Sequence, residues 1–400
     1  MRSFKMNTVK PKTEFNLLQA LFGVYAMLIM SWIPRFPEIK ANLGLSNGQF
    51  GTLISTGSFG AVASLFLTGH MVHKYGVKRV ILANIWLMGF AYFFIVRTES
   101  SGIFLICNIA IGWSTSAYHI SINAQSFNAM ERVKDLTIAR LHGMWALGTL
   151  TTAIISGLIV NHITISWHVG GLAVVVTLTL TAMVQRLTPV LVKANEHDDA
   201  HLPLKTLFTS FRVDWLISGG LLCAVFLEFC TGDWSAIFAK ERIGVSSGLA
   251  ALPYVVFMIA MITGRLSAST LAKRFRVHNT IRLFALLGGG GFLTFLTITV
   301  QIPAEHKNLA LLTSCVAFGF AGMGSSLMAP TFYTAANRRS SLPSAVVVGQ
   351  MGVINMPSVF ILKAVVAWTA QFSGSLAIAL TIPALMLIAT AFFAHAVKEE

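Results

Sequence analysis

Very few ionisable residues lie inside the long apolar stretches of this sequence, and these few are the ones that could do chemistry. Glu228 has apolar neighbours on both sides, and Asp233 follows it in the same stretch. A carboxylate inside such a segment is costly and usually has a function, so Glu228 is a candidate for exchanging a proton or binding a polar ligand. The alternative is a structural ion pair with a base of another helix, for example Arg265 or Lys363.

Two polar residues of another apolar stretch form a second candidate site. His119 and Asn123 are spaced i,i+4 and therefore share one face of a helix. The histidine could titrate or bind an anion, and the asparagine offers a donor and an acceptor to a polar ligand. A histidine that is simply satisfied by a neighbouring helix is an equally good interpretation.

Aromatic and charged residues near the ends of other stretches are weaker candidates. Trp32, Trp145 and Tyr118 could line a cavity, although tryptophan also anchors helices at a membrane interface. Asp233 points about 140° away from Glu228 on a helix and suits an outer gate as well as a ligand contact. Arg35 and Glu38 predict an ion pair at the rim, the alternative being that Arg35 guides an anion inward.

The elements that must position these residues are twelve apolar stretches. They are expected at 16–34, 48–70, 79–97, 102–126, 140–161, 166–185, 212–234, 248–271, 280–300, 308–334, 343–367 and 374–395. Each has roughly the 20 residues that cross a bilayer. The chain is 55% hydrophobic and 11% charged, with a mean hydropathy of +0.72. A soluble core cannot absorb so many all-apolar helices, so an all-α membrane protein is predicted.

The polar interval 186–211 divides the stretches into two sets of six. It predicts an N-terminal six-helix bundle at 1–190, a linker at 191–211 and a C-terminal bundle at 212–400. Most of the 29 Lys and Arg residues fall in alternate loops, which places both termini in the cytoplasm. The net charge of +14 therefore reflects membrane-flanking loops, and no nucleic-acid partner is expected. The four cysteines lie in apolar stretches and predict neither disulfides nor a metal site.

A loop motif occurs twice, once in each half. The first copy carries Gly69, His73, Lys74, Gly76 and Arg79, and a degenerate copy follows the eighth stretch. Gly69 would let two helices approach closely, Gly76 would permit a tight turn, and the cations would anchor the cytoplasmic edge. The motif resembles the gating loop G-x-x-x-D-[RK]-x-G-[RK]-[RK] of the major facilitator superfamily. His73 replaces the family's acid, so the latch formed by that acid cannot be transferred unchanged, and a solvated histidine is the alternative.

Further resemblance is spread along the chain. It is carried by residues 31–39, 123–125 and 141–148 and by Glu228 and Asp233, which together are similar to the fucose-permease-like branch and to a bacterial inner-membrane subgroup of mostly unassigned substrate. The resemblance implies two six-helix bundles around a central cavity, with alternating access to a site near the bilayer midplane. It also implies a gating or packing role for His142 and a loop-bracing role for Arg265. Related members often carry an acid where His119 stands.

These observations predict a secondary active transporter, not an enzyme, in the inner membrane. The expected cargo is a small polar solute, with a sugar or sugar derivative favoured, moved with protons by a monomer without cofactor, metal or catalytic residues. The basic residues and His119 leave an anionic metabolite open. An exporter of drugs or metabolites is one alternative, and a non-transport sensor or scaffold is another. The sequence has no nucleotide-binding motif, so a self-contained ATP-driven pump is not expected.

Overall fold

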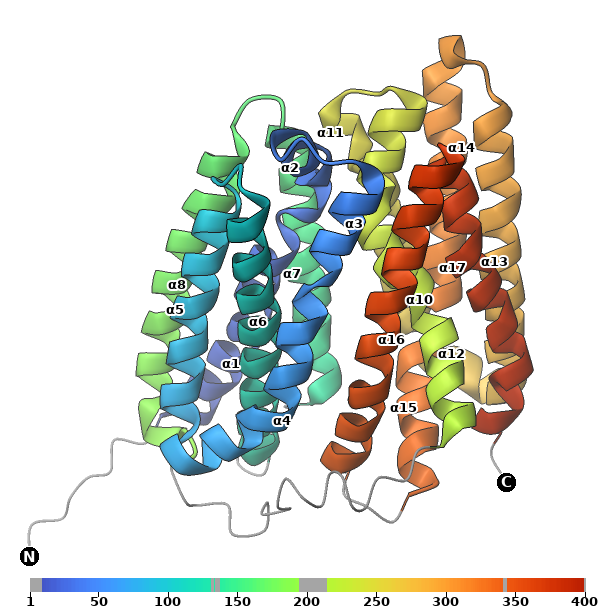
Figure 1. Ribbon diagram of the computed structural model, residues 1–400. Helices are drawn as coiled ribbons and strands as arrows, with labels where there is room; N and C mark the ends of the chain where they lie inside the picture. The colour runs from blue at the N-terminus through green and yellow to red at the C-terminus, as the bar shows by residue number, and fades with distance from the viewer. Residues whose placement is uncertain (1–8, 131–132, 134–136, 194–213, 341–343, 399–400) are drawn as a thin grey trace, which may run out of the picture.

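The computed structural model describes residues 9–130, 133, 137–193, 214–340 and 344–398. All secondary structure in these ranges is helical (Figure 1). The N-terminal half contains α1 (Pro11–Met30), η1 (Ile33–Arg35), α2 (Phe36–Asn42), α3 (Asn47–Ser55), α4 (Gly57–Tyr75), α5 (Val77–Ile95), α6 (Ser101–Met130), α7 (Ile138–Ile159), α8 (Ile165–Leu187) and η2 (Thr188–Val190). The C-terminal half contains α10 (Trp215–Phe238), the π-helical turn η4 (Ala239–Ile243), α11 (Ser247–Ala250), α12 (Leu252–Arg274), α13 (Val277–Gln301), η5 (Ala304–His306), α14 (Lys307–Ser325), α15 (Met328–Arg338), α16 (Ser344–Ser373), α17 (Leu376–Phe393) and η6 (Ala394–Val397).

Twelve spans among the described residues are long and apolar enough to cross a membrane, which confirms the predicted all-α membrane fold. Several spans are longer than predicted because their polar ends continue as helix beyond the apolar core. The tenth, for example, runs from Ala304 to Arg338. Both termini lie at the same end of the molecule, here called the terminal end, and the opposite end is called the far end (Figure 1).

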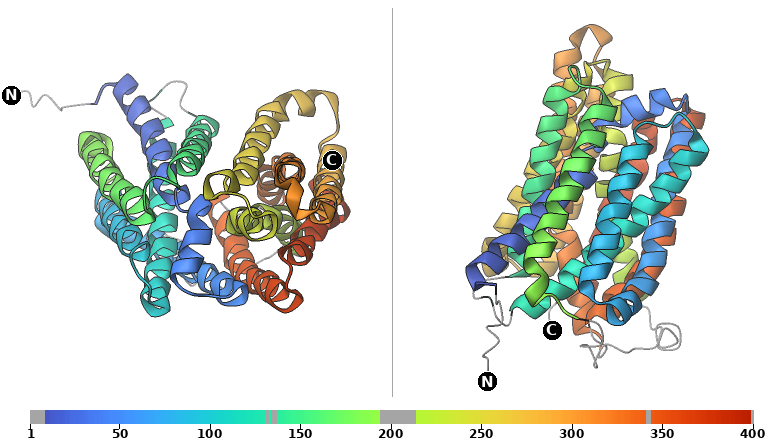
Figure 2. Two further views of the ribbon diagram at one scale, coloured as in Figure 1. Left: turned by 90° about the horizontal axis from the view of Figure 1, so that it is seen from above. Right: turned by 90° about the vertical axis from the view of Figure 1, so that its left-hand side faces the viewer.

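The helices form two bundles that stand side by side (Figure 2). In the first bundle α6 packs against α4 and α5, and α8 packs against α5 and α1. In the second bundle α14 packs against α12 and α13, and α17 packs against α13 and α10. The two halves therefore repeat one packing scheme, as the twice-occurring loop motif indicates. The linker predicted at 191–211 falls largely outside the described residues.

The second span is broken at Thr56, where α3 ends and α4 begins. The side-chain amide of Asn108 donates to the carbonyl oxygens of Leu53 and Ile54 at 3.0 and 2.9 Å, and contacts the Thr56 hydroxyl at 3.1 Å. Leu53 also accepts from the backbone amide of Thr56 at 3.2 Å, so the Asn108 amide adds a second donor there and supplies one to Ile54. Backbone carbonyls at a break inside a membrane need such partners. One helical turn after Asn108, the Cα of Gly112 lies directly against the carbonyl group of Gly57.

The loop between α4 and α5 has the tight turn that its sequence predicts. Gly76 has a φ of 79°, a conformation that favours glycine. The amide of Val77 donates to the carbonyl of Val192 at 3.1 Å, and Gln125 of α6 bonds both Val190 and Val192. Gly69 does not mediate a close approach as predicted, because it is exposed and a Cβ placed there would meet no atom within 4 Å.

The first helix of the second bundle is fixed at the terminal end by Asp214. Its Oδ1 caps α10 by accepting from the amides of Leu216 and Ile217, and its Oδ2 accepts from Arg339 at 2.8 Å. Partial burial opposes ionisation, but the bonds from Arg339 and from the backbone prevail and hold the pKa of Asp214 below its ordinary value. The pair therefore links the start of α10 to the residue that follows α15.

Candidate functional site

Polar contacts join the two bundles at the far end. Lys40 of α2 forms an ion pair with Glu241 of η4, and the amide of Asn47 donates to the same carboxylate at 3.3 Å. Nearby, the indole of Trp368 donates to Thr52 at 3.1 Å. Neither Lys40 nor Glu241 stands out in the sequence, because the two residues are 201 positions apart and both resemble solvated loop charges. Together these contacts hold the two bundles against each other at the far end in this conformation.

Reversing the charge of Lys40 is expected to weaken this closure. Lys40→Glu places two carboxylates together, and at roughly 1 kcal/mol for a partly exposed pair the ratio of closed to open molecules should fall about fivefold. Spin labels at Ser100 and Ser246, in a background without the native cysteines, would then report a longer distance between the bundles. The double variant Lys40→Glu, Glu241→Lys should restore the short distance.

Arg242→Glu is the matched control for this experiment. Its guanidinium bonds the carbonyl of Val300 within the second bundle and takes no part in the cross-bundle pair. The gate assignment fails if Arg242→Glu lengthens the distance as much as Lys40→Glu does.

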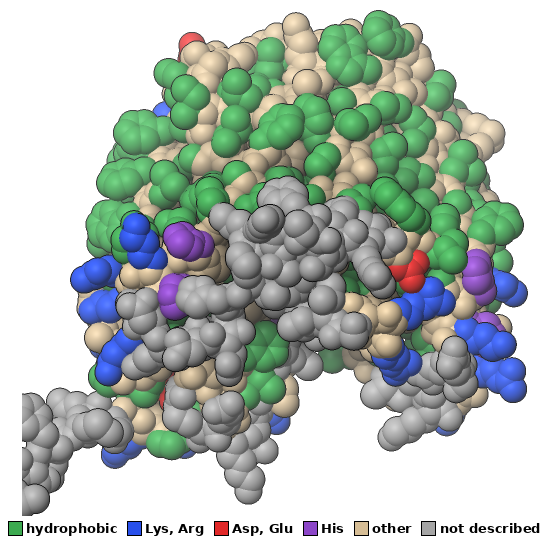
Figure 3. All heavy atoms as spheres, turned by 60° about the horizontal axis from the view of Figure 1, so that its bottom comes forward, with side chains coloured by type: hydrophobic (Ala, Val, Ile, Leu, Met, Phe, Trp, Pro, Cys, Tyr) green, Lys and Arg blue, Asp and Glu red, His purple; other side chains and the backbone are tan. Residues whose placement is uncertain are grey.

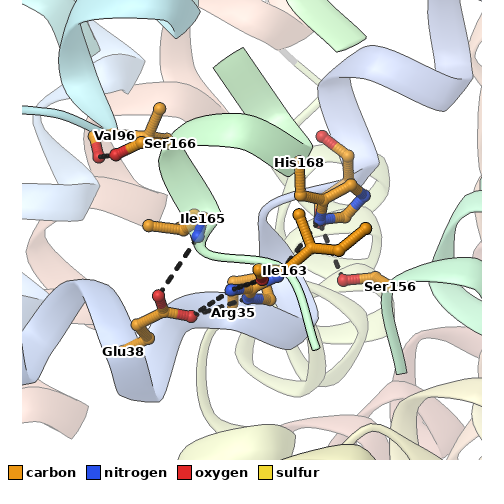
Figure 4. A network of polar contacts seen from close by, with 9 residues as sticks. Arg35, Glu38, Val96, Ser156, Ile163, Ile165, Ser166 and His168 are labelled. Carbon is orange, nitrogen blue, oxygen red and sulfur yellow. Dashed lines mark hydrogen bonds and ion pairs between the residues drawn. The ribbon is translucent and has the colours of Figure 1, made fainter. Parts of the chain in front are cut away.

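The helix that carries Lys40 is held by a buried network around Arg35 (Figure 4). Arg35 is fully buried and donates to the Glu38 carboxylate at 2.7 Å and to the carbonyl of Ile163 at 2.9 Å. Glu38 also accepts from the amide of Ile165 at 3.2 Å, so η1 and α2 are tied to the start of α8. The predicted ion pair is therefore confirmed. Arg35 is interior because the α7–α8 loop covers it, whereas the Glu38 side chain is 32% exposed.

Glu228 lies about midway along α10 and faces Arg265 of α12. Their closest charged atoms are 3.8 Å apart, and the two side chains are 28% and 32% exposed. Tyr254 and Tyr333 lie close enough for the Glu228 charge to act on them. Arg265 stands about 13 Å of helix before the end of α12, and the loop-bracing role that the resemblance implies stays a prediction. Arg265 makes one other described hydrogen bond, a long one of 3.4 Å from its Nε to the carbonyl oxygen of Ser326.

Two histidines of the first bundle lie across from this pair. The rings of His119 in α6 and His142 in α7 are 5.6 Å apart, and Phe22 of α1 packs edge-on against both. His142 is exposed and near enough to Arg265 for their charges to interact. The Nε2 of His119 is buried and has no hydrogen-bond partner among the described residues. The structure therefore brings together His119, His142, Glu228 and Arg265, residues from four different helices.

Asp233 faces a different helix from Glu228, as the helical spacing predicts. Its carboxylate binds Lys363 of α16 at 2.7 Å, and both side chains are largely buried at 12% and 15% exposure. Lys363 does not extend toward solvent as a lysine at the end of a span can, because this acid lies within reach. It also stands 5.6 Å from the centre of the Phe229 ring. The Asp233–Lys363 pair is therefore shielded from solvent, whereas the Glu228–Arg265 pair is partly accessible to it.

The predicted aromatic residues mostly lie inside the first bundle. Tyr118 is fully buried, stacks on Tyr25 with ring centres 4.4 Å apart and bonds the carbonyl of Leu21. Trp32 is 7% exposed and packs against Phe36, Tyr92 and Phe104. These two side chains pack inside the first bundle and line no exposed surface in this conformation. Trp145 and Asn123 are half-buried, and the Asn123 amide donates to the backbone carbonyl of His119 at 2.9 Å.

The face at the terminal end is rich in basic side chains (Figure 3). Lys74 and Arg79 are exposed beside the first loop motif, and His73 is partly buried. Arg274, Arg276 and Arg282 are exposed beside the second. The charges agree with the pattern from which the orientation was predicted, and the gating role of these loop residues stays a prediction.

Three comparisons extend these observations. An uncharacterized MFS-type transporter of Yersinia pestis is 25% identical over 382 residues, covering 94% of each chain. The crystal structure of the nucleoside transporter NupG has a TM-score of 0.72 at 14% identity, covering 96% of this chain and 99% of that one. A D-xylose-proton symporter has a TM-score of 0.67 at 15% identity, covering 96% of each chain. The profile of the Major Facilitator Superfamily matches residues 17–362, and the chain therefore belongs to that family of multi-pass membrane transporters.

Proposed function

We propose that the protein is a secondary active transporter that couples a small polar solute to protons through Glu228. The observation that carries the proposal is the open pair of Glu228 and Arg265, which stand 3.8 Å apart and about a third exposed between the bundles. An acid in this position can gain and lose a proton as the cavity opens to either side. A neighbouring arginine favours the ionised form, so the pair can release its proton again.

Alternating access supplies the rest of the cycle. Both termini and the basic face are assigned to the cytoplasm by the distribution of Lys and Arg, and a bacterial inner membrane is the compartment that the sequence favours. The contacts around Lys40 and Glu241 then close the periplasmic side. Rocking of one bundle against the other would break these contacts and expose the Glu228 region to the far end.

The decisive experiment uses purified protein in vesicles that contain a pH-sensitive dye. Sugars, nucleosides and carboxylates are added outside in turn, and the pH inside is recorded. A solute that enters together with protons should acidify the lumen, and a protonophore should remove the signal. The same vesicles made without protein serve as the control.

The sign of the pH change separates the candidate functions. Acidification supports symport, whereas a solute that makes the lumen more alkaline would indicate proton antiport and an exporter. Entry of a labelled solute without any pH change would contradict proton coupling, although the protein would remain a transporter.

A further inference from the structure

We infer that the solute is an organic anion, and that its acidic group binds Arg265 in place of Glu228 once Glu228 is protonated. This inference rests on the proposed function and names the class of substrate for the same site. Two observations support it. The Glu228–Arg265 and Asp233–Lys363 pairs of α10 differ in geometry, and few acids lie within the spans.

The Glu228–Arg265 pair is loose where the neighbouring pair is tight. The charged atoms of Asp233 and Lys363 are 2.7 Å apart, whereas those of Glu228 and Arg265 are 3.8 Å apart, beyond hydrogen-bond distance. A guanidinium has five N–H donors in a planar fork that matches a carboxylate. Within the described residues, only the long contact with the Ser326 carbonyl uses one of them. Arg265 therefore keeps donors available for a second acidic group.

No other acid of the spans can neutralise Arg265. Of the 15 Asp and Glu residues, Glu228 and Asp233 alone stand in the middle of a span, and Asp233 is bound by Lys363. The other titratable groups near Glu228 are Tyr254 and Tyr333, which are neutral at physiological pH, and His142 near Arg265 can only add positive charge. Protonation of Glu228 thus leaves an arginine without a counter-charge at membrane depth.

An uncompensated charge at this depth is unfavourable, so a second anion that pairs with Arg265 is stabilised when Glu228 is protonated. The exchange binds one proton and one anion together and leaves the net charge of the site unchanged. His142 stands near Arg265 and can donate to the same acidic group. A neutral sugar would leave the arginine uncompensated, which is why the geometry favours an anion.

The test measures the melting temperature of the purified chain with matched pairs of probes at a mildly acidic and a mildly alkaline pH. The pairs are 3-phenylpropionate with 3-phenylpropanamide, butyrate with butyramide, and gluconate with glucose. At least one carboxylate should stabilise the protein where its neutral partner does not. Its affinity should rise up to about tenfold for each unit by which the pH falls, because one proton binds with each anion.

Two variants make the result specific to the site. Glu228→Gln mimics the protonated acid and should bind the same carboxylate equally well at both pH values. Arg265→Gln should bind it at least tenfold more weakly, and Arg265→Lys should be intermediate because it keeps the charge and loses the fork. The lysine variant keeps the test valid if the glutamine variant does not fold.

Several results would overturn the anion site. They are stabilisation by the neutral member of a pair, unchanged binding in both Arg265 variants, or silence of every carboxylate. A neutral solute that acidifies the vesicle lumen would refute the anion and leave the proposed symport intact. A carboxylate that binds without moving protons would refute the coupling and leave the anion site intact.

Discussion

Replacing Glu228 by glutamine is expected to abolish solute-driven proton movement and to leave the protein folded. The amide keeps the size and the hydrogen-bonding capacity of the acid but cannot carry a proton at any physiological pH. The loss of an essential proton-transfer group typically lowers the rate of the step that it serves by roughly 10²-fold or more. Exchange of labelled solute across the membrane at equal pH should persist, because exchange needs the rocking motion without net proton transfer.

The stability of this variant should fall only modestly, and a bound carboxylate should restore it. The variant leaves Arg265 without its counter-charge, but the two side chains are 28% and 32% exposed, so water lowers the cost of the unpaired charge. The comparison variant is Asp233→Asn with Lys363→Met, which removes the shielded pair as a unit. It should lower the melting temperature and retain solute-driven proton movement. Equal proton signals from Glu228→Gln and the wild type would disprove the assignment of Glu228 as the coupling acid.

The second large effect is expected at Gly112, where a single methyl group should disrupt the first bundle. A Cβ at this position would stand 1.8 Å from the carbonyl oxygen of Gly57, a distance that no pair of such atoms can adopt. Gly112→Ala therefore forces α4 and α6 apart and strains the bonds from Asn108 that close the break at Thr56. Overpacking of this kind usually costs about 1–3 kcal/mol, and rigid backbone on both sides places this case at or above the upper limit.

The apparent melting temperature, followed by tryptophan fluorescence, would measure this effect. Gly171→Ala is the matched control, because Gly171 also lies inside a long helix, α8, and a Cβ there meets no atom within 4 Å. The control should melt at the wild-type temperature or slightly above it, since alanine favours the helix. A Gly112→Ala protein as stable as the Gly171→Ala protein would show that the α4–α6 crossing is looser than described.

The sequence alone determined the class of fold and singled out Glu228 as the candidate acid for proton exchange. Twelve apolar stretches suffice to predict the spans, because each must satisfy its own backbone in the membrane whatever its neighbours are. The rarity of acids in those spans makes Glu228 a candidate for proton exchange, and the helical period places Asp233 on another face. The turn at Gly76 was predicted because its backbone requirement is local.

The tertiary structure alone decided which groups meet. Both Arg265 and Lys363 were possible partners of Glu228, and only the packing of α12 and α16 around α10 assigns one base to each acid. Three other features likewise depend on helices that are far apart in the sequence. They are the exposure of Gly69, the burial of Tyr118 and the pairing of Lys40 with Glu241. The helical period fixes the direction of a side chain on its own helix. The neighbour it reaches is set by how the helices pack, and that packing is a sum of many small contacts that no short stretch of sequence contains.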